Sequence, residues 1–194
     1  MIAAERIQYL QDRISRTEEQ QAYKELFIEL YPWLCQFAMT FIKSKELAEE
    51  IVSDVFIKIW EKRKELGKIN NLKVYLYVAT RNTAFNYLDQ QKHVDSGDIE
   101  QFSAKLRSPY FDPEQLMITT EMVFLIQNAI DKLPPKCRMV FKLVKEDGLK
   151  YKEVAEILNI SVKTVENHLA IALRKIGAVV SFDIHKTVSS PLGQ

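Results

Sequence analysis

The chain has 194 residues, of which 47% are hydrophobic and 27% are charged, with a formal net charge of +1. This composition is typical of a folded globular protein and excludes a disordered chain. No stretch approaches the roughly 18 apolar residues of a membrane span and no N-terminal segment resembles a signal peptide, so we expect a cytoplasmic protein. Cys35 and Cys137 lie in apolar helical patterns without metal-ligand spacing, which favours buried free thiols.

The charges divide unevenly along the chain. Residues 1–94 carry a net charge of +1, residues 95–114 carry −3 and residues 115–194 carry +3. Counterion release from so few cations gives only weak binding to DNA at physiological salt. Any strong binding to nucleic acid therefore needs a second source of affinity.

Three amphipathic helices are predicted in the N-terminal half. The first spans residues 20–43, and Pro32 is expected to kink or interrupt it. The second begins at Ser44, a favourable N-cap, and ends near Gly67. The third spans about residues 72–91, with apolar side chains at helical spacing.

The pattern changes after the third helix. Residues 95–113 have an acidic bias, two prolines and no sustained period, which predicts a flexible linker. Helical periodicity resumes at Glu114 and ends before Pro134–Pro135, and a further helix is predicted over residues 136–146. Asp147–Gly148 then forms a turn. The expected fold class is all-α, with two helical domains joined by the linker.

Residues 150–176 predict a helix-turn-helix. Its first helix spans residues 151–158, and Asn159 occupies the corner because Asn enters the left-handed region at low cost. Ser161 supplies the N-cap of the second helix, which Gly177 can end. The inward face of this second helix is predicted to consist of Val165, Leu169, Ala172, Leu173 and Ile176.

Polar side chains remain on or beside the outward face of the second helix. Lysine and arginine neutralise phosphates, asparagine pairs with adenine, and threonine contacts bases or the thymine methyl group. An ordinary helical hairpin with a hydrated polar side is the alternative, and Glu166 favours it slightly because a carboxylate near phosphates is unfavourable. The candidate DNA contacts are Lys163, Thr164, Asn167, His168 and Arg174.

The order of these parts resembles that of bacterial extracytoplasmic-function (ECF) sigma factors, especially the type abundant in Bacteroidetes. The sequence similar to their promoter-binding domain 4 is LPPKCRMVFKLVKEDGLKYKEVAEILNISVKTVENHLAIALRKI. The sequence similar to their domain 2 is AEEIVSDVFIKIWEKR followed by YLYVATRNTAFNYLDQQKH. The match covers roughly residues 20–180. It implies domain 2 at residues 1–94, the linker at 95–113, domain 4 at 114–182 and a tail at 183–194.

The resemblance implies an alternative RNA polymerase sigma factor that directs promoter recognition and transcription initiation. Core RNA polymerase, bound through its β′ clamp helices and β flap, would then supply the missing affinity through linked sites. Promoter DNA and, as is frequent in the family, a membrane-bound anti-sigma factor are the other implied partners, and no cofactor is implied. Asp54, Lys58 and Glu61 would contact the polymerase, and the outward face of the second helix-turn-helix helix would contact the −35 element.

The resemblance also places −10 element contacts in the loop Gly67–Lys73 and the following helix. Tyr75, Tyr77 and Tyr87 are equally well explained as core aromatics. The sequence departs from the family pattern at Val78, where a basic residue is common. The helix also ends in DQQKH instead of a run of arginines, so the −35 assignment is better supported. The implied −10 residues are Asn70, Asn71, Lys73, Arg81, Asn82, Asn86 and Tyr87.

Two other classes of function remain open from the sequence. A conventional helix-turn-helix regulator would bind a palindromic operator without polymerase, and a helical adaptor would bind only proteins through the charged face around Asp54. An enzyme is disfavoured, because His93, His168 and His185 lie far apart and no glycine-rich phosphate loop is present.

Overall fold

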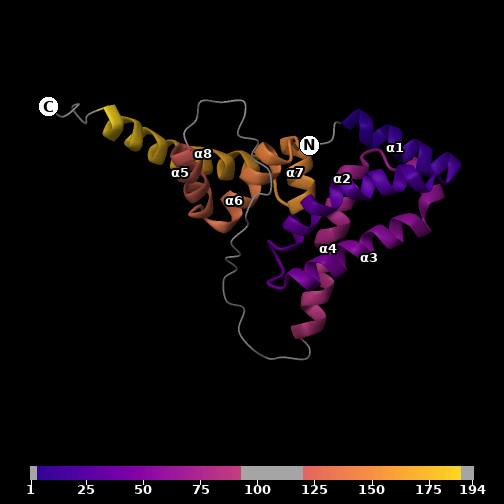
Figure 1. Cartoon of the computed structure of the whole chain (residues 1–194). Helices are drawn as coiled ribbons and strands as arrows, with labels where there is room; N and C mark the ends of the chain where they lie inside the picture. Colours follow the sequence, from indigo (N-terminus) through magenta and orange to yellow (C-terminus); the bar gives the residue numbers. More distant parts are fainter. Residues whose placement is uncertain (1–3, 93–119, 189–194) are drawn as a thin grey trace. The chain divides into compact units, whose positions relative to one another are not determined.

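The computed structural model describes residues 4–92 and 120–188, and all regular elements within these ranges are helical (Figure 1). The prediction of an all-α fold is confirmed. The chain divides into an N-terminal and a C-terminal unit, each described here by itself. The predicted linker, and the start of the helix predicted from Glu114, lie outside the described residues.

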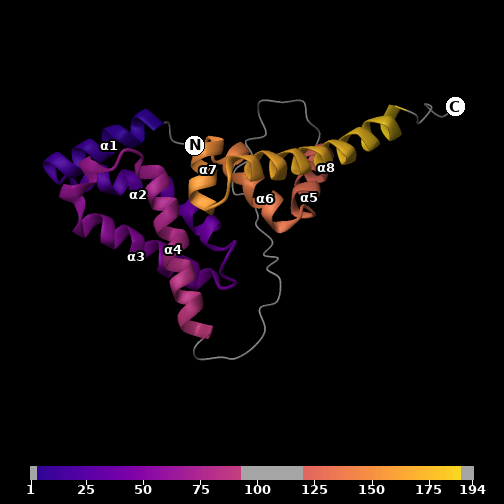
Figure 2. The ribbon, with the colours of Figure 1, turned by 180° about the vertical axis from the view of Figure 1, so that it is seen from behind.

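The N-terminal unit consists of four α-helices and one 3-10 helix, and Figure 2 shows the same helices from behind. They are α1 (Ala4–Thr17), α2 (Gln20–Ala38), α3 (Lys45–Glu61), the 3-10 helix η1 (Arg63–Lys68) and α4 (Leu72–Lys92). The sequence analysis did not predict α1, although Ile7, Leu10 and Ile14 form a buried stripe at helical spacing.

The core of this unit is built from large side chains of all five helices. Aromatic rings contribute edge-to-face pairs, such as Phe27 with Phe56 at 4.8 Å between centroids. Full burial of each such side chain stabilises the fold by about 1.5–3 kcal/mol. The largest fully buried side chains are Leu10, Ile14, Leu26, Leu30, Leu34, Phe56, Leu66, Leu72, Leu76 and Tyr77.

Helices α2 and α3 of the N-terminal unit each differ from the prediction in one respect. Helix α2 continues through Pro32 without interruption, because Pro32 is exposed and the carbonyl it leaves unpaired belongs to the exposed Ile28. Helix α3 begins as predicted, with the Ser44 hydroxyl accepting from the N–H of Leu47 at 3.1 Å. It ends at Glu61 rather than near Gly67, and η1 takes up the remaining residues.

The C-terminal unit contains α5 (Thr120–Asp131), α6 (Pro135–Phe141), a π-helical turn η3 (Lys142–Glu146), α7 (Tyr151–Leu158) and α8 (Val162–Val188). The helix predicted over residues 136–146 is thus α6 followed by a π turn. Gly148 has φ 62°, and the N–H of Leu149 reaches back to the Leu143 carbonyl at 3.0 Å. The core cluster contains Leu133, Cys137 and Ala172, with Phe141, Ile171 and Ile176 packed against it.

Helix α8 departs from the prediction in two ways. It continues through Gly177 to Val188. A glycine that ends a helix commonly adopts positive φ, and Gly177 does not. The prediction that Leu173 faces inward is also wrong, since Leu173 is 45% exposed while Ile171 packs against the core. Among the described helices, none is long and apolar enough to cross a membrane.

Candidate nucleic-acid interface

The corner between α7 and α8 has the geometry of a helix-turn-helix. Asn159 adopts φ 54°, the left-handed conformation predicted for it. Its N–H donates to the Glu156 carbonyl at 3.2 Å, and the N–H of Ile160 donates to the Ala155 carbonyl at 3.0 Å. These two bonds form a Schellman motif, which satisfies the last carbonyls of α7 and fixes the direction in which the chain leaves it.

Ser161 caps the first turn of α8, as predicted. Its hydroxyl accepts from the backbone N–H of Thr164 at 3.0 Å and lies 2.8 Å from the Thr164 hydroxyl. The Thr164 side chain is therefore half-buried and engaged in the cap. The corner and the cap together set the starting angle of α8 within a few residues of sequence.

Three of the five candidate −35 residues are exposed on α8: Lys163, Asn167 and Arg174. They are spaced by four and seven residues, so they share one side of the helix. The Lys163 ammonium pairs with the carboxylate of Glu166 at 3.2 Å. The exposed face thus offers an amide and two cations, together with one carboxylate.

His168 lies beside the exposed face of α8 rather than on it. It is half-buried, and its Nδ1 lies 3.5 Å from the Sγ of Cys137 on α6. Cys137 is a buried free thiol, and burial raises its pKa above the ordinary value. The predicted buried thiol is confirmed at Cys137, whereas Cys35 is only half-buried, with burial raising its pKa to about 11.

The two adjacent asparagines of the candidate −10 site differ in their contacts in the loop before α4. The Asn71 side chain accepts from the N–H of Val74 at 3.1 Å, and its carbonyl accepts from the N–H of Tyr75 at 3.0 Å. Asn71 is therefore the N-cap of α4. Asn70 is exposed one residue earlier, and Lys73 is half-buried in the first turn.

The remaining candidate −10 residues lie along α4. The Arg81 guanidinium donates to the Asn82 side-chain oxygen from Nε at 3.1 Å and from a terminal nitrogen at 2.8 Å. Asn86 is exposed, while Tyr87 packs against the core cluster of Ile42, Ile51 and Ala84. Arg81 and Asn82 thus form a coupled polar pair, and Tyr87 has a structural role in the described core.

The three tyrosines left open by the sequence separate clearly. Tyr77 is 1% exposed and belongs to the core, Tyr75 is 43% exposed, and Tyr87 is half-buried. Phe85 is also largely exposed on α4, a feature that the sequence analysis missed. Tyr75 and Phe85 are therefore the exposed aromatic side chains of α4, and the Phe85 ring also packs against Phe41 at 5.0 Å between centroids.

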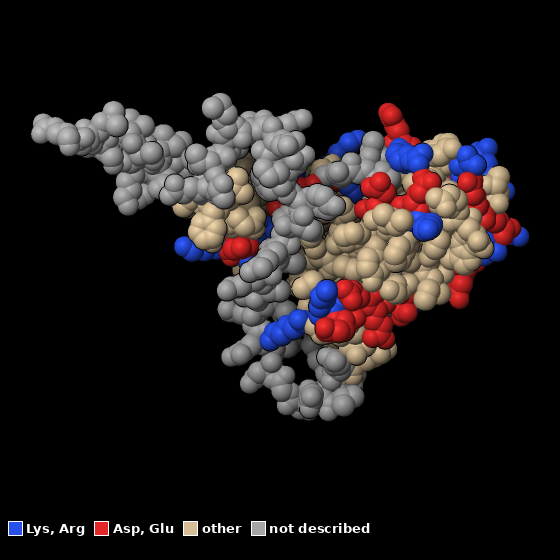
Figure 3. All heavy atoms as spheres, in the orientation of Figure 1, with Lys and Arg blue, Asp and Glu red and all other residues tan. Residues whose placement is uncertain are grey.

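The candidate polymerase contacts Asp54, Lys58 and Glu61 are exposed on α3, at intervals of four and three residues. Ile57 lies on the same side and is 54% exposed, which the sequence analysis did not predict. Its position three residues after Asp54 was the available signal. On the face shown in Figure 3, acidic and basic side chains of the described surface are interspersed with uncharged ones.

Two family models match the chain. Residues 26–94 match "Sigma-70 region 2" and residues 124–176 match "Sigma-70, region 4", which together span more than half of the chain in the family's order. The chain belongs to the sigma-70 family.

Curated relatives place this sigma factor in the ECF group. The "ECF RNA polymerase sigma-E factor" of Escherichia coli K12 is 27% identical over 169 residues, which cover 84% of this chain and 87% of the relative. The "RNA polymerase sigma-H factor" of Pseudomonas aeruginosa is 23% identical over 176 residues, which cover 87% and 91%. The sigma factor is therefore an alternative sigma subunit that recognises promoters, and not an enzyme by itself.

Two solved structures share its fold. The sigma factor RpoE of Bartonella quintana, solved in complex with the anti-sigma factor NepR, aligns with a TM-score of 0.57 and 20% identity, covering 83% of this chain and 98% of that one. CnrH, solved in complex with the cytosolic domain of CnrY, aligns with a TM-score of 0.53 and 20% identity, covering 93% and 99%. These likenesses support the helical architecture described above.

Proposed function

We propose that this sigma factor directs core RNA polymerase to promoters by contacting a −35 element with α8 and a −10 element with the loop before α4. The observation that carries the proposal is the row of exposed Lys163, Asn167 and Arg174 on a helix whose orientation is fixed by a Schellman corner and an N-cap. A second helix of this kind enters the major groove of DNA.

On α8, Asn167 is proposed to contact a base edge, while Lys163 and Arg174 contact phosphates. Thr164 contributes mainly by holding the first turn of the helix through its contact with Ser161. His168 is proposed to act at the edge of the surface, positioned by its contact with Cys137.

In the N-terminal unit, Asn70 is proposed to hydrogen-bond an extruded base of the −10 element, because its side chain is exposed while Asn71 caps α4. Lys73 and the Arg81–Asn82 pair are proposed to bind the backbone of the unpaired strand, together with Asn86. Tyr87 is proposed to support this surface from the core.

Asp54, Lys58 and Glu61 are proposed to dock on the β′ clamp helices of the polymerase, with Ile57 supplying apolar contact in the same patch. The C-terminal unit is proposed to bind the β flap. At an interface, such charged side chains give electrostatic complementarity with the partner, and an apolar residue among them contributes buried apolar area.

We further propose that the sigma factor acts in the cytoplasm, where the polymerase is, and belongs to the type abundant in Bacteroidetes. A membrane-bound anti-sigma factor is a proposed regulator. The complex of the similar RpoE with NepR supports an anti-sigma partner, and the membrane location rests on the family resemblance.

A gel-shift assay with a matched pair of conditions tests the central proposal. A promoter fragment obtained by run-off transcription on a genomic library is mixed with the chain alone and with the chain plus core polymerase. We expect a specific complex only with core polymerase, because a net charge of +1 gives little counterion release. Tight, specific binding by the chain alone would instead support a conventional regulator.

A further inference from the structure

Helix α1 lies before the segment that matches sigma-70 region 2, yet it contributes a buried polar side chain to the −10 loop. Gln11 is 1% exposed. Its Nε2 donates to the carbonyl oxygen of Leu66 at 2.6 Å and to that of Ile69 at 2.7 Å, 55 and 58 residues further along the chain. Both N–H groups of one amide are thus used on the backbone of a single short segment.

The surroundings of Gln11 are apolar, which makes these two bonds directional constraints. Leu10, Ile14 and Leu66 are all fully buried around this contact. Without the Gln11 amide, the Leu66 carbonyl would keep its bond from the N–H of Ile69, at 2.9 Å, while the partly buried Ile69 carbonyl would lose its tie to α1. The Gln11 amide therefore ties the backbone of Leu66 and Ile69 to α1, in addition to the bond that these two residues make with each other.

The other end of the loop is fixed by a different device. Asn71 caps α4 through the N–H of Val74. Asn70, the exposed candidate base contact, thus lies between two anchored residues, Ile69 and Asn71. Its side chain leaves a backbone whose position is set before any DNA binds.

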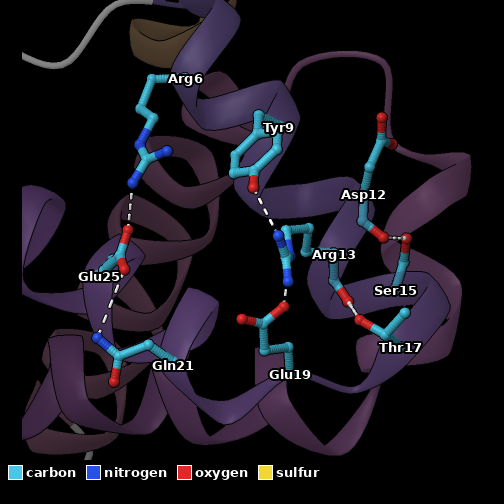
Figure 4. Close-up of polar contacts among 9 residues, drawn as sticks. All are labelled: Arg6, Tyr9, Asp12, Arg13, Ser15, Thr17, Glu19, Gln21 and Glu25. Carbon is cyan, nitrogen blue, oxygen red and sulfur yellow. Dashed lines mark hydrogen bonds and ion pairs between the residues drawn. The ribbon is translucent and has the colours of Figure 1, made fainter.

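Helix α1 is anchored mainly by its buried side chains Ile7, Leu10 and Ile14, and ion pairs on its exposed side add ties to α2. Figure 4 shows that Arg6 of α1 pairs with Glu25 of α2. It also shows that the Arg13 guanidinium pairs with Glu19 and donates a hydrogen bond to the Tyr9 hydroxyl. These ties connect α1 to the start and the middle of α2, on the side away from the loop contact.

The end of α1 is tied directly to η1. Glu18 adopts φ 53° and ends α1, and its carboxylate contacts Arg63 at 2.6 Å and Lys64 at 3.1 Å. Hydrogen bonds from Lys64 and Arg63 lower the pKa of Glu18 below its ordinary value of 4.5. Ser15 also lies close to Gly67, with its Oγ 3.5 Å from where a Cβ at that glycine would stand.

We propose that Gln11 is a positioning residue for promoter recognition, holding the loop from which Asn70 reaches an unpaired base. The inference rests on the proposed −10 role of the Gly67–Lys73 loop. It assigns a role in DNA discrimination to a helix that lies outside the proposed DNA contacts.

The test compares Gln11→Met with Gln8→Met in holoenzyme assembled from the full chain and core RNA polymerase. Methionine keeps the length and helix propensity of glutamine but removes the donors. Gln8 lies on the exposed side of the same helix and bonds only Asp12 among its described contacts, at 3.3 Å. The probes are a labelled non-template single strand with the −10 element mapped by run-off transcription, and the same strand with those bases scrambled.

The measured quantity is the dissociation constant for the scrambled strand divided by the dissociation constant for the strand with the −10 element. A poorly folded fraction weakens binding to both strands equally, so the ratio reports the loop alone. For Gln11→Met we expect this ratio to fall about fivefold, which is the effect of losing one net hydrogen bond between Asn70 and its base. For Gln8→Met we expect the ratio to stay unchanged. Amide hydrogen exchange over residues 69–74 should accelerate only in Gln11→Met.

An unchanged ratio for Gln11→Met, or an equal fall for Gln8→Met, would overturn the positioning role while leaving the proposed function intact. If the unaltered holoenzyme does not distinguish the two strands, the proposed −10 role and this inference both fail. If Gln11→Met does not fold, Gln11→Asn carries the same test, because it retains the amide but is one methylene too short to keep both bonds.

Discussion

The two units of this sigma factor prepare their candidate DNA contacts in different ways. In the C-terminal unit, the contacts lie on α8, and the corner at Asn159 and the cap at Ser161 set the helix within a few residues. In the N-terminal unit, Asn70 lies on a loop whose backbone is held by Gln11 from a helix 55 residues earlier. The contact surface on α8 is therefore specified by residues nearby in sequence, whereas the loop before α4 depends on a residue distant in sequence.

The largest expected effect breaks the N-terminal unit away from polymerase. Asp54→Lys reverses a charge in the proposed clamp contact, so we expect affinity for core polymerase to fall by about 2 kcal/mol or more. Competition binding against labelled sigma factor measures this loss. Glu29→Lys, an equal charge change at an exposed site on α2, is the control and should have little effect. Unchanged transcription with Asp54→Lys would remove α3 from the polymerase interface.

The next effect concerns base reading by the C-terminal unit. Asn167→Ala should relax base preference in the upstream element and cost roughly 1–3 kcal/mol on the preferred sequence, because a bidentate amide contact is lost. Holoenzyme binding to a panel of promoters with single substitutions in the −35 element measures the change. Equal losses on every sequence would contradict base contact and assign Asn167 to the backbone.

A smaller effect separates phosphate contact from base contact on the same helix. Lys163→Ala should weaken binding about evenly across sequences and lower the slope of log K against log salt by about one unit. Holoenzyme titrations at several salt concentrations measure both quantities. A loss restricted to one promoter sequence, with the slope unchanged, would show that Lys163 reads a base.

The smallest effect concerns the stability of the C-terminal unit rather than binding. Gly177 lies inside α8, and a Cβ there would meet no atom within 4 Å. Gly177→Ala should therefore stabilise the C-terminal unit by up to about 1 kcal/mol. Ala178→Gly at the neighbouring exposed position should destabilise it by a similar amount. Thermal unfolding followed by circular dichroism measures both, and no stabilisation by alanine would place the helix end near residue 177.

Local signals account for the parts of the structure that the sequence predicted well. The Schellman corner, the Ser161 and Ser44 caps and the all-α fold each follow from residue types within one turn of their site. The exposed positions of Lys163, Asn167 and Arg174 follow from helical spacing alone.

Tertiary contacts account for the errors. Leu173 exchanges its expected place with Ile171, because the helices packed against α8 decide which side of it is covered. The end of α8 was misplaced because glycine permits a helix end without requiring one. The exposure of Ile57 and the role of Gln11 depend on neighbours distant in sequence, which spacing within one helix does not reveal.

The amide of Gln11 has a consequence for experiments that exchange modules between sigma factors. The segment that matches region 2 begins at residue 26, so a chimaera cut at that boundary would leave Gln11 behind. The carbonyls of Leu66 and Ile69 would then face a side chain of the other sigma factor. The chimaera would contain the loop before α4 without the Gln11 amide that holds it. The transplantable module of this protein starts no later than Ala4, where α1 begins.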